Sequence, residues 1–306
     1  MNILILQGGN SPEREVSLRS AANVAKALRE LRHTVTTYDT KEGLEGLTAQ
    51  LARANVVFPV LHGQGGEDGT VQDFLESYRV AFVGSKAEAS RKCFNKATAK
   101  KLFEENALPT PRWEEVTAEG FATSPLISAP YVLKPHSGGS SIDTIIVRNP
   151  ADYKMNLNVF ERHGGKMILE ELIVGTEMTV AILGAEALPV VEIIPPEGKD
   201  FDYENKYNGK TREICPPETI TESIQEEAQS LAEQAHELLG ARHYSRVDIM
   251  MSSNGELYVL EINTIPGLTE QSLFPKAAEA AGLPMSTVVE RLIDMAVKNK
   301  SSNESY

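Results

Sequence analysis

The sequence predicts an α/β protein in which an N-terminal parallel-sheet lobe is followed by two α+β lobes. Strand and helix patterns alternate up to about residue 84, whereas short strands around glycine-rich loops follow it. The chain has 306 residues, of which 41% are hydrophobic and 24% charged, values typical of a folded globular protein with two or three domains. We expect the three lobes to span residues 1–84, 85–172 and 173–306.

The N-terminal lobe is predicted from apolar runs that end at glycine-rich stretches. Its predicted strands are Ile3–Leu6, Val56–Leu61 and Val80–Val83. After the first of these, residues 16–31 carry apolar side chains at helical spacing. In parallel sheets of this kind, ligands bind beyond the carboxyl ends of the strands. The glycine-rich stretches 8–11 and 62–69 lie at two such ends, so both are candidate ligand loops.

The two α+β lobes are predicted from a different pattern. A lysine-rich helix over residues 89–106 runs into Leu108–Pro111, where two prolines favour an extended linker. The clearest helix follows Thr221 as its N-cap, has apolar residues at helical spacing, and stops at Gly240. A terminal helix is expected near residues 286–297. The predicted strands are 131–134, 142–147, 167–172, 177–183 and 188–194.

Charge and cysteine content limit the partners. The net charge is −13 and the pI is about 5.1, so a general basic surface for nucleic acid is not expected. Cys93 and Cys215 are too few for a disulfide framework, which favours a reducing cytoplasm. The apolar run at residues 3–6 is too short for a signal peptide or a membrane span. We therefore expect small-molecule partners, and neither nucleic acid nor membrane.

A β-hairpin carries the strongest signal for a metal site. Asn-Gly at 254–255 separates two alternating apolar runs and predicts a tight turn. Asp248 then lies opposite Glu261, and Arg246 and Asn263 form the next pair on the same face. Opposed carboxylates repel each other unless a cation neutralises them, and carboxylate and amide oxygens suit Mg²⁺. The alternative is a solvated strand face. The other face is predicted to hold Val247, Ile249, Leu260 and Ile262.

Two further segments suit a nucleotide. Lys134 ends an apolar strand, and the loop 135–141 after it is rich in glycine and serine, whose N–H and hydroxyl groups suit phosphate. Residues 167–177 form an apolar strand that runs into a polar bend, with carboxylates suited to adenine and ribose. Each segment has an ordinary alternative: a mobile hairpin loop for the first, and a surface strand end for the second.

Three longer motifs complete the pattern. They are Gly8-Gly9-Asn10-Ser11-Pro12-Glu13-Arg14-Glu15-Val16-Ser17, His62-Gly63-Gln64-Gly65-Gly66-Glu67-Asp68-Gly69, and Glu261-Ile262-Asn263-Thr264-Ile265-Pro266-Gly267-Leu268-Thr269 with Ser272-Leu273 after it. With the lysine loop, the adenine segment and the hairpin, this order resembles the D-alanine–D-alanine ligases of the ATP-grasp class over about residues 1–297. The chain departs at Glu171, where relatives often carry lysine, and at Asp73, where glycine is common.

The resemblance implies a fold and an activity. The fold is a Rossmann-like N-terminal lobe followed by an ATP-grasp fold of two α+β lobes. The activity joins two D-alanines through an acyl phosphate, giving D-alanyl-D-alanine, ADP and phosphate for peptidoglycan precursors. ATP and two Mg²⁺ ions, with Mn²⁺ as a possible substitute, are the implied cofactors, and a homodimer is the implied assembly.

The resemblance also implies a set of site residues. Those for catalysis are Glu15, Ser140, Tyr207, Arg246 and Gly267. Those for the amino-acid substrates are His62, Lys206, Ser272 and Leu273. Those for ATP are Lys96, Lys134, Glu170, Glu171, Ile173 and Glu177. The metal ligands are Asp248, Glu261 and Asn263.

Two other functions stay open on the sequence. One is another ATP-grasp carboxylate–amine ligase, or a D-alanine–D-lactate ligase; in the family, a tyrosine at position 207 favours D-alanine over D-lactate. The other is a catalytically silent nucleotide-binding protein. Such a protein is expected to have lost some of the hairpin's polar residues, whereas this chain keeps Arg246, Asp248, Glu261 and Asn263.

Overall fold

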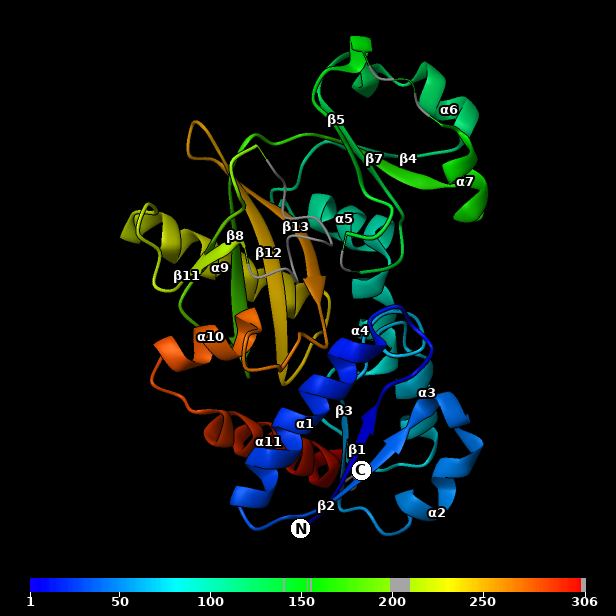
Figure 1. Cartoon of the computed structure of the whole chain (residues 1–306), viewed down its shortest axis with the longest axis vertical. Coiled ribbons are helices and arrows are strands. Elements are labelled where there is room, and N and C mark those ends of the chain that lie inside the picture. The colour runs from blue at the N-terminus through cyan, green and yellow to red at the C-terminus, as the bar shows by residue number, and fades with distance from the viewer. Residues whose placement is uncertain (140, 153, 155, 199–209, 304–306) are drawn as a thin grey trace.

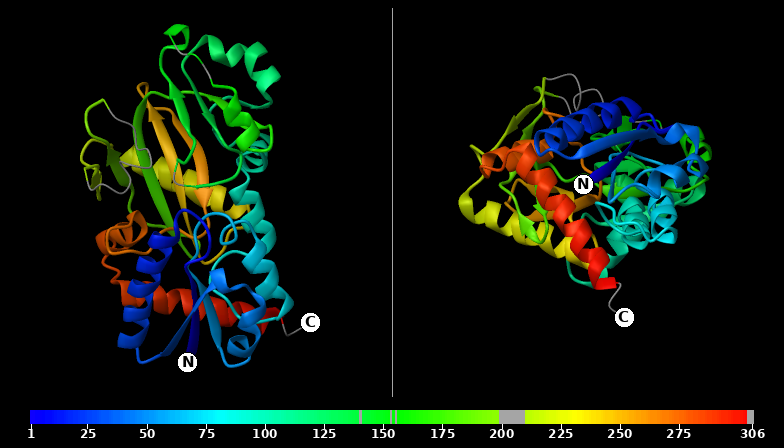
Figure 2. Two further views of the ribbon diagram at one scale, coloured as in Figure 1. Left: turned by 45° about the vertical axis from the view of Figure 1, so that its right-hand side comes forward. Right: turned by 90° about the horizontal axis from the view of Figure 1, so that it is seen from below.

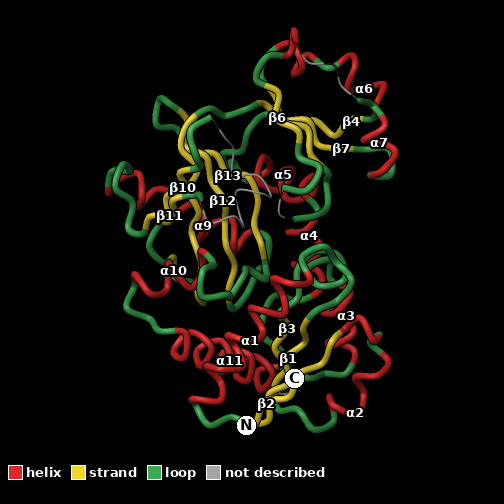
Figure 3. The backbone as a smooth tube through the Cα atoms, in the orientation of Figure 1, coloured by secondary structure: helices red, strands yellow, loops and turns green. Residues whose placement is uncertain are grey.

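The structure is a computed structural model that describes residues 1–139, 141–152, 154, 156–198 and 210–303. The described residues form three lobes (Figure 1). The N-terminal lobe lies at the bottom of the view, the central lobe at the top, and the C-terminal lobe between them. Each lobe contains its own β-sheet (Figure 3). No helix within the described ranges is both long and apolar enough to span a membrane.

The N-terminal lobe is the predicted parallel sheet, in the order β2-β1-β3. Its strands are β1 (Asn2–Gln7), β2 (Thr34–Asp39) and β3 (Val56–Pro59). The predicted strand at 80–83 is reduced to a single parallel bridge between Val57 and Phe82. Helix α1 covers the sheet because its apolar stripe, including Val24 and Leu28, is buried. The helices are α1 (Arg14–Glu30), α2 (Thr48–Leu51), α3 (Thr70–Ser77) and the short 3₁₀ turns η1 (Thr40–Glu42) and η2 (Glu45–Leu47).

The central lobe is an antiparallel sheet in the order β4-β7-β5-β6. Its strands are β4 (Trp113–Val116), β5 (Tyr131–Lys134), β6 (Ile145–Val147) and β7 (Met167–Glu171). Its helices are α6 (Ala118–Thr123), α7 (Asn158–Arg162), η3 (Pro125–Ser128) and η4 (Pro150–Asp152). Phe121 packs against Tyr131 and Phe160 in a core that belongs to this lobe alone. The lobe can therefore move as a unit relative to the others.

The C-terminal lobe is an antiparallel sheet in the order β11-β10-β8-β12-β13, with β9 paired to β8. Its strands are β8 (Gly175–Leu183), β9 (Glu186–Ala187), β10 (Val191–Ile194), β11 (Arg212–Ile214), β12 (Tyr244–Ser252) and β13 (Leu257–Asn263). Helix α9 (Glu222–Leu238) covers one face. Thr221 caps it as predicted, because its side chain accepts the Ile224 N–H.

The lobe boundaries differ from those that we predict from the sequence. Helices α4 (Ala87–Phe94) and α5 (Lys96–Glu105) pack on the C-terminal sheet, since Cys93 and Phe103 share a core with Val180 and Val247. Helices α10 (Leu273–Ala280) and α11 (Met285–Asn303) share a core with the N-terminal lobe. Helix α11 packs against α1 (Figure 2). The N- and C-terminal lobes thus form one base, and the central lobe stands on it.

The predicted pairing of the hairpin is confirmed at the site. It arises from a longer loop and a β-bulge that offset each other, which the sequence did not show. Asp248 pairs with Glu261, and Arg246 pairs with Asn263. The loop has three residues rather than two, because Ser252 pairs with Glu256 across it. A β-bulge at Leu260 then restores the predicted register.

The bulge also changes which side chains reach the core. Val259 pairs with Ile249 and is fully buried in the core. Leu260 lies instead on the face that lines a cavity. The prediction that Leu260 shares the face of Val247, Ile249 and Ile262 is therefore wrong, because the extra residue reverses the alternation at that position.

A buried histidine joins the N- and C-terminal lobes. The Gly84 N–H donates to Nδ1 of His243 at 3.1 Å, and Nε2 lies 2.7 Å from the side-chain amide of Asn299. A ring nitrogen that accepts a hydrogen bond carries no proton, so His243 is neutral here. Burial, helped by the nearby Arg242 charge, lowers the pKa of His243 to about 3. Protonation of His243 would break the bond that holds Gly84.

We predict that this histidine makes the fold sensitive to acid. The unfolded chain takes up a proton on His243 near pH 6.5, whereas the folded chain does so only near pH 3. Stability from this group is therefore present above pH 6.5 and is lost as the pH falls. Between pH 7 and pH 5 the loss is about 2 kcal/mol. In urea denaturation at both pH values, His243→Asn should shrink the difference in unfolding free energy by this amount. An equally steep pH dependence in the variant contradicts the assignment.

Candidate functional site

Two adjoining cavities lie where the three lobes meet. The larger, about 1090 Å³, lies between the central sheet and the C-terminal sheet. The smaller, about 470 Å³, lies between the N- and C-terminal lobes. They share a wall, so a group bound in one cavity can reach a group bound in the other. The shared wall consists of Glu13, Phe94, Lys96, Gly138, Gly139 and Glu261.

A buried carboxylate between two lysines borders the larger cavity. One oxygen of Glu170 lies 2.5 Å from Nζ of Lys134, and the other lies 2.8 Å from Nζ of Lys100. Burial acts to raise the pKa of Glu170, but the two ammonium groups outweigh it and lower that pKa. Burial lowers the pKa of Lys100 against the opposing effect of Glu170. For Lys134, burial acts to lower the pKa, and Glu170 and Glu261 reverse this and raise it.

Lys96 ties the central lobe to the hairpin. Its ammonium group donates to the Gly138 carbonyl at 2.7 Å and lies 3.0 Å from Oε2 of Glu261. Its backbone N–H donates to the His136 carbonyl at 2.7 Å. The loop before Ser140 is thereby held against the start of α5. Gly139 lies close to Glu13, since a Cβ there would be 3.1 Å from a Glu13 carboxylate oxygen and that side chain would have to shift slightly.

The lining of the larger cavity combines apolar and acidic side chains. Its apolar lining includes Val132, Ile146, Ile173, Met250 and Leu260. Glu171 and Glu177 line the same cavity, and Glu171 pairs with Arg112 at 2.7 Å. An apolar lining with a few polar groups suits a nucleobase. The residues predicted for ATP thus border a single cavity, and the carboxylate of Glu170 is paired with Lys100 and Lys134.

The hairpin brings the predicted metal ligands together. Asp248 accepts from Nε and Nη2 of Arg246, both at 2.9 Å, and from the Thr179 hydroxyl at 2.6 Å. Glu261 faces Lys96, and Oδ1 of Asn263 accepts the Ile265 N–H at 2.8 Å. The oxygen donors fit a hard divalent cation. Within the described ranges, no cluster of three or more His, Cys, Asp or Glu side chains could hold an ion alone, so an ion here needs the amide and ligand oxygens too.

The smaller cavity contains an unusual acidic pair. Glu67 is buried, and Oε2 accepts the Gly63 N–H at 2.7 Å. Burial, together with the charge of Glu13, raises the pKa of Glu67 to about 8. Beside them, burial lowers the pKa of His62, and its Nε2 has no hydrogen-bond partner within the described part of the chain. Both shifts favour the uncharged forms of Glu67 and His62 at neutral pH, and Glu13 lines the cavity beside them.

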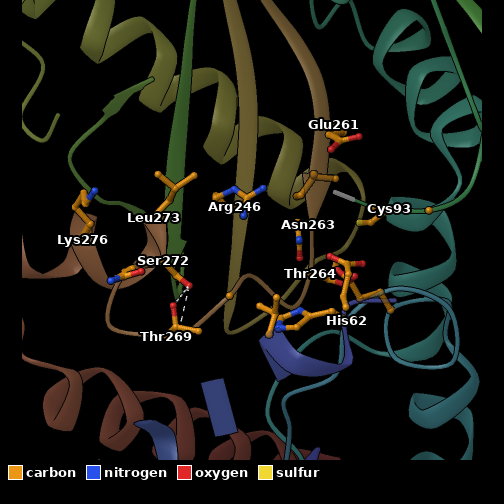
Figure 4. A pocket seen from close by; sticks show the side chains of 18 of the residues that line it. His62, Cys93, Arg246, Glu261, Asn263, Thr264, Thr269, Ser272, Leu273 and Lys276 are labelled. Atoms are coloured by element: carbon orange, nitrogen blue, oxygen red, sulfur yellow. Dashed lines mark hydrogen bonds between the residues drawn. The ribbon is translucent and has the colours of Figure 1, made fainter. Parts of the chain in front are cut away.

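The opposite wall of the smaller cavity is the start of α10. Ser272 and Leu273 line it, and the Ser272 hydroxyl accepts the Thr269 N–H at 3.1 Å. Figure 4 shows Ser272, Leu273 and Lys276 on one side of Arg246, with His62, Cys93 and Glu261 on the other. Gly267 approaches Ser272 so closely that a Cβ would lie 2.8 Å from its hydroxyl oxygen. Free N–H groups at this helix start suit a carboxylate.

One residue predicted for the site lies outside it, and a nearby residue lies there instead. Glu15 is exposed in the first turn of α1 and lines neither cavity. Glu13, two residues earlier, is buried and lines both. The prediction of Glu15 for the site is therefore corrected to Glu13. Both acids lie in the same motif, and only the point at which α1 begins decides which one faces inward.

Some residues of the site were missed, and some cannot be placed. Glu13, Glu67 and Lys100 were not predicted for the site. Glu67 lies inside a quoted glycine-rich motif, so that motif was the available signal; Lys100 had none beyond a lysine-rich helix. The predicted residues that lie outside the described residues are Ser140, Lys206 and Tyr207.

The fold and the cavities define a class of protein. Two antiparallel sheets, from separate lobes, enclose a large cavity whose lining includes apolar side chains together with Lys96 and Lys134. A hairpin with opposed carboxylates borders this cavity. This arrangement is the nucleotide-binding grip of an ATP-grasp enzyme.

Comparison with known proteins gives the family. A model described as D-ala D-ala ligase C-terminus matches residues 102–294, and one described as D-ala D-ala ligase N-terminus matches residues 40–85. The chain therefore belongs to the D-alanine–D-alanine ligase family.

Individual relatives agree over nearly the whole chain. A D-alanine–D-alanine ligase of Nitratidesulfovibrio vulgaris is 38% identical over 97% of this chain and 98% of its own. One of Methylacidiphilum infernorum is 40% identical over 96% and 95%. The crystal structure of D-alanine–D-alanine ligase from Bacillus anthracis complexed with ATP superposes with a TM-score of 0.86 at 29% identity, covering 99% of both chains.

Proposed function

We propose that this chain joins two D-alanine molecules, with ATP converted to ADP and phosphate. The observation that carries the proposal is the shared wall of the two cavities, where Lys96, Gly138 and Glu261 border both. A nucleotide in the larger cavity can then present its terminal phosphate to a carboxylate in the smaller one. The names of the curated relatives supply the identity of the amino acid.

The proposed reaction has two steps, and the chain's charges suit both. A carboxylate oxygen of the first D-alanine attacks the terminal phosphorus, and ADP leaves. The amine of the second D-alanine then attacks the acyl carbon, phosphate leaves, and the amine loses a proton. Lys96 and Lys134 neutralise phosphate charge in the first step. Arg246 and Gly267 line the smaller cavity, and the guanidinium and the Gly267 N–H are the groups proposed to stabilise the tetrahedral oxyanion of the second step.

The two amino-acid positions follow from the two walls of the smaller cavity. Glu13 offers a carboxylate that suits the ammonium of the first D-alanine, and it lies in the shared wall of the two cavities. The start of α10, at Ser272 and Leu273, suits the carboxylate of the second D-alanine. His62, with an unpartnered Nε2, suits a contact to either substrate. Ser140, Lys206 and Tyr207 keep the roles that the family resemblance gives them.

We further propose that Asp248, Glu261 and Asn263 hold two Mg²⁺ ions, which Mn²⁺ can replace. Two carboxylates and an amide on paired strands offer hard oxygen donors, and phosphate oxygens complete the shells. When bound, the ions neutralise charge on the phosphates. The proposed setting is the cytoplasm, with a homodimer as the assembly and the dipeptide used for peptidoglycan precursors.

The first prediction here concerns the activity itself. The purified chain with ATP and Mg²⁺ should release phosphate on addition of D-alanine, and D-alanyl-D-alanine should accumulate in equal amount. L-Alanine serves as the matched control, because it has the same charges but the wrong hand for the cavity. D-Lactate added with D-alanine tests the ester-forming alternative. Phosphate release that does not depend on D-alanine contradicts the proposal.

The second prediction separates the two neighbouring acids. Glu13→Gln removes the anionic group at the shared wall, and we expect kcat/KM for D-alanine to fall by a factor of about 100 or more. Glu15→Gln removes the same charge from the exposed helix start and should change kcat/KM by less than about threefold. Steady-state kinetics on both variants measure this. The reverse order of the two effects would return the role to Glu15.

The third prediction concerns the metal. Glu261→Gln removes one anionic oxygen donor, so the Mg²⁺ concentration for half-maximal activity should rise about tenfold or more. Glu256→Gln is the matched control, because Glu256 lies on the same hairpin but is exposed, and its carboxylate accepts hydrogen bonds from Asn254 and Tyr258 near the turn. A Mg²⁺ titration at saturating ATP measures both variants. An unaltered Mg²⁺ requirement in Glu261→Gln contradicts the assignment.

A further inference from the structure

Lys100 is a fully buried lysine that lies behind the nucleotide cavity. Its side chain has an exposed fraction of 0%, and it lines neither cavity. Its ammonium group lies 2.8 Å from Oε2 of Glu170 and donates to the Thr110 hydroxyl at 2.7 Å. Thr110 in turn donates to the Val259 carbonyl at 2.8 Å. Burying an ammonium group is costly unless partners offset its lost hydration, and here the charged partner is a carboxylate of another lobe.

The position of Lys100 determines the charge that the cavity presents. Glu170 has one oxygen on Lys100 and the other on Lys134, and only Lys134 and Glu170 reach the cavity wall. With both lysines charged, the cluster carries one net positive charge beside the phosphate-binding loop. Without Lys100, Glu170 and Lys134 would form a neutral pair, with Lys134 drawn fully to the carboxylate. A triphosphate would then meet no net positive charge from this cluster.

We propose that Lys100 is a positioning residue for the nucleotide's phosphates, acting through Glu170 to leave the charge of Lys134 available to them. Lys100 touches neither nucleotide nor amino acid. It links α5, on the base of the molecule, to β7 of the central lobe, so it also fixes the central sheet at the angle at which Lys134 faces the cavity. The inference deepens the proposed function, since it concerns the same nucleotide site.

The test compares nucleotides that differ only in phosphate charge. Lys100→Met removes the charge and keeps most of the volume. We expect its affinity for ATP to fall at least about tenfold, while its affinity for adenosine stays within about twofold. Lys101→Met is the matched control, because Lys101 is the next residue of α5, largely exposed, and 3.9 Å from Glu105. It should leave both affinities and the ligase activity unchanged.

Binding is measured by competition of adenosine, ADP and ATP against a fluorescent ATP analogue at fixed Mg²⁺, after circular dichroism confirms folding. The ratio of ATP to adenosine affinity is the readout, since a packing defect would weaken both ligands alike. An unchanged ratio in Lys100→Met overturns the proposal. Steady-state kinetics give a second readout: KM for ATP should rise at least about tenfold, while KM for D-alanine stays within about twofold.

A second variant keeps the test decisive if Lys100→Met does not fold. The double variant Lys100→Met/Glu170→Gln removes both partners of the buried pair and again leaves Lys134 with its charge. Its ratio of ATP to adenosine affinity should lie within about threefold of the unmodified chain. A ratio lowered about tenfold or more in the double variant contradicts the charge argument. Any contact that Glu170 makes with adenine affects both ligands and cancels in the ratio.

The outcomes separate this inference from the proposed function. Binding is measured without D-alanine, so the ratio is defined even if the chain ligates a different amino acid. If the unmodified chain binds ATP but releases no phosphate with D-alanine, the proposed function fails and the Lys100 result still counts. If the chain ligates D-alanine and Lys100→Met keeps its ATP preference, the inference alone fails.

Discussion

The site depends on one electrostatic constraint: two carboxylates face each other across a hairpin. Asp248 and Glu261 occupy paired positions of β12 and β13, where Cβ atoms come within about 5.5 Å. Their repulsion has to be offset by cations, and the structure takes these from two places. Arg246 comes from the same strand, and Lys96 comes from α5. Lys96 also donates to the Gly138 carbonyl. The lysine that offsets the carboxylate charge therefore also holds the loop of the central lobe against the hairpin.

A second ion cluster places the central lobe in the same way. The apolar core of that lobe is its own, and among the described residues this core includes no side chain of the base. Lys100 and Glu170 join the two bodies through charge instead. Polar contacts of this kind are directional and can be exchanged for contacts with a ligand, whereas a shared apolar core resists separation. Exchangeable polar contacts suit a lobe that admits and releases a nucleotide. A shared apolar core suits a base that holds the amino-acid cavity open.

The sequence predicted what depends on local pattern. Alternation and an Asn-Gly turn predicted the pairing of Asp248 with Glu261, which holds because a bulge offsets the longer loop, and Thr221 was recognisable as a cap from its neighbours. What it missed depends on geometry beyond the pattern. The bulge moves Leu260 to the cavity but keeps Asp248 paired with Glu261. A correctly predicted pairing therefore gives no sign that the bulge exists. Whether Glu13 or Glu15 faces the site depends only on where α1 begins. Whether Lys100 or Lys101 is buried depends only on which face of α5 meets β7.

The charges at the junction explain why divalent ions belong to the proposed reaction. In the cluster where the two cavities meet, Lys96, Lys100, Lys134 and Arg246 lie among the carboxylates of Glu13, Glu170, Asp248 and Glu261. Burial and the charge of Glu13 raise the pKa of Glu67 beside them to about 8. Within this cluster the four cations are matched by four carboxylates, so it offers a bound triphosphate no excess of positive charge. In the proposed reaction, divalent ions on the opposed carboxylates would supply that charge.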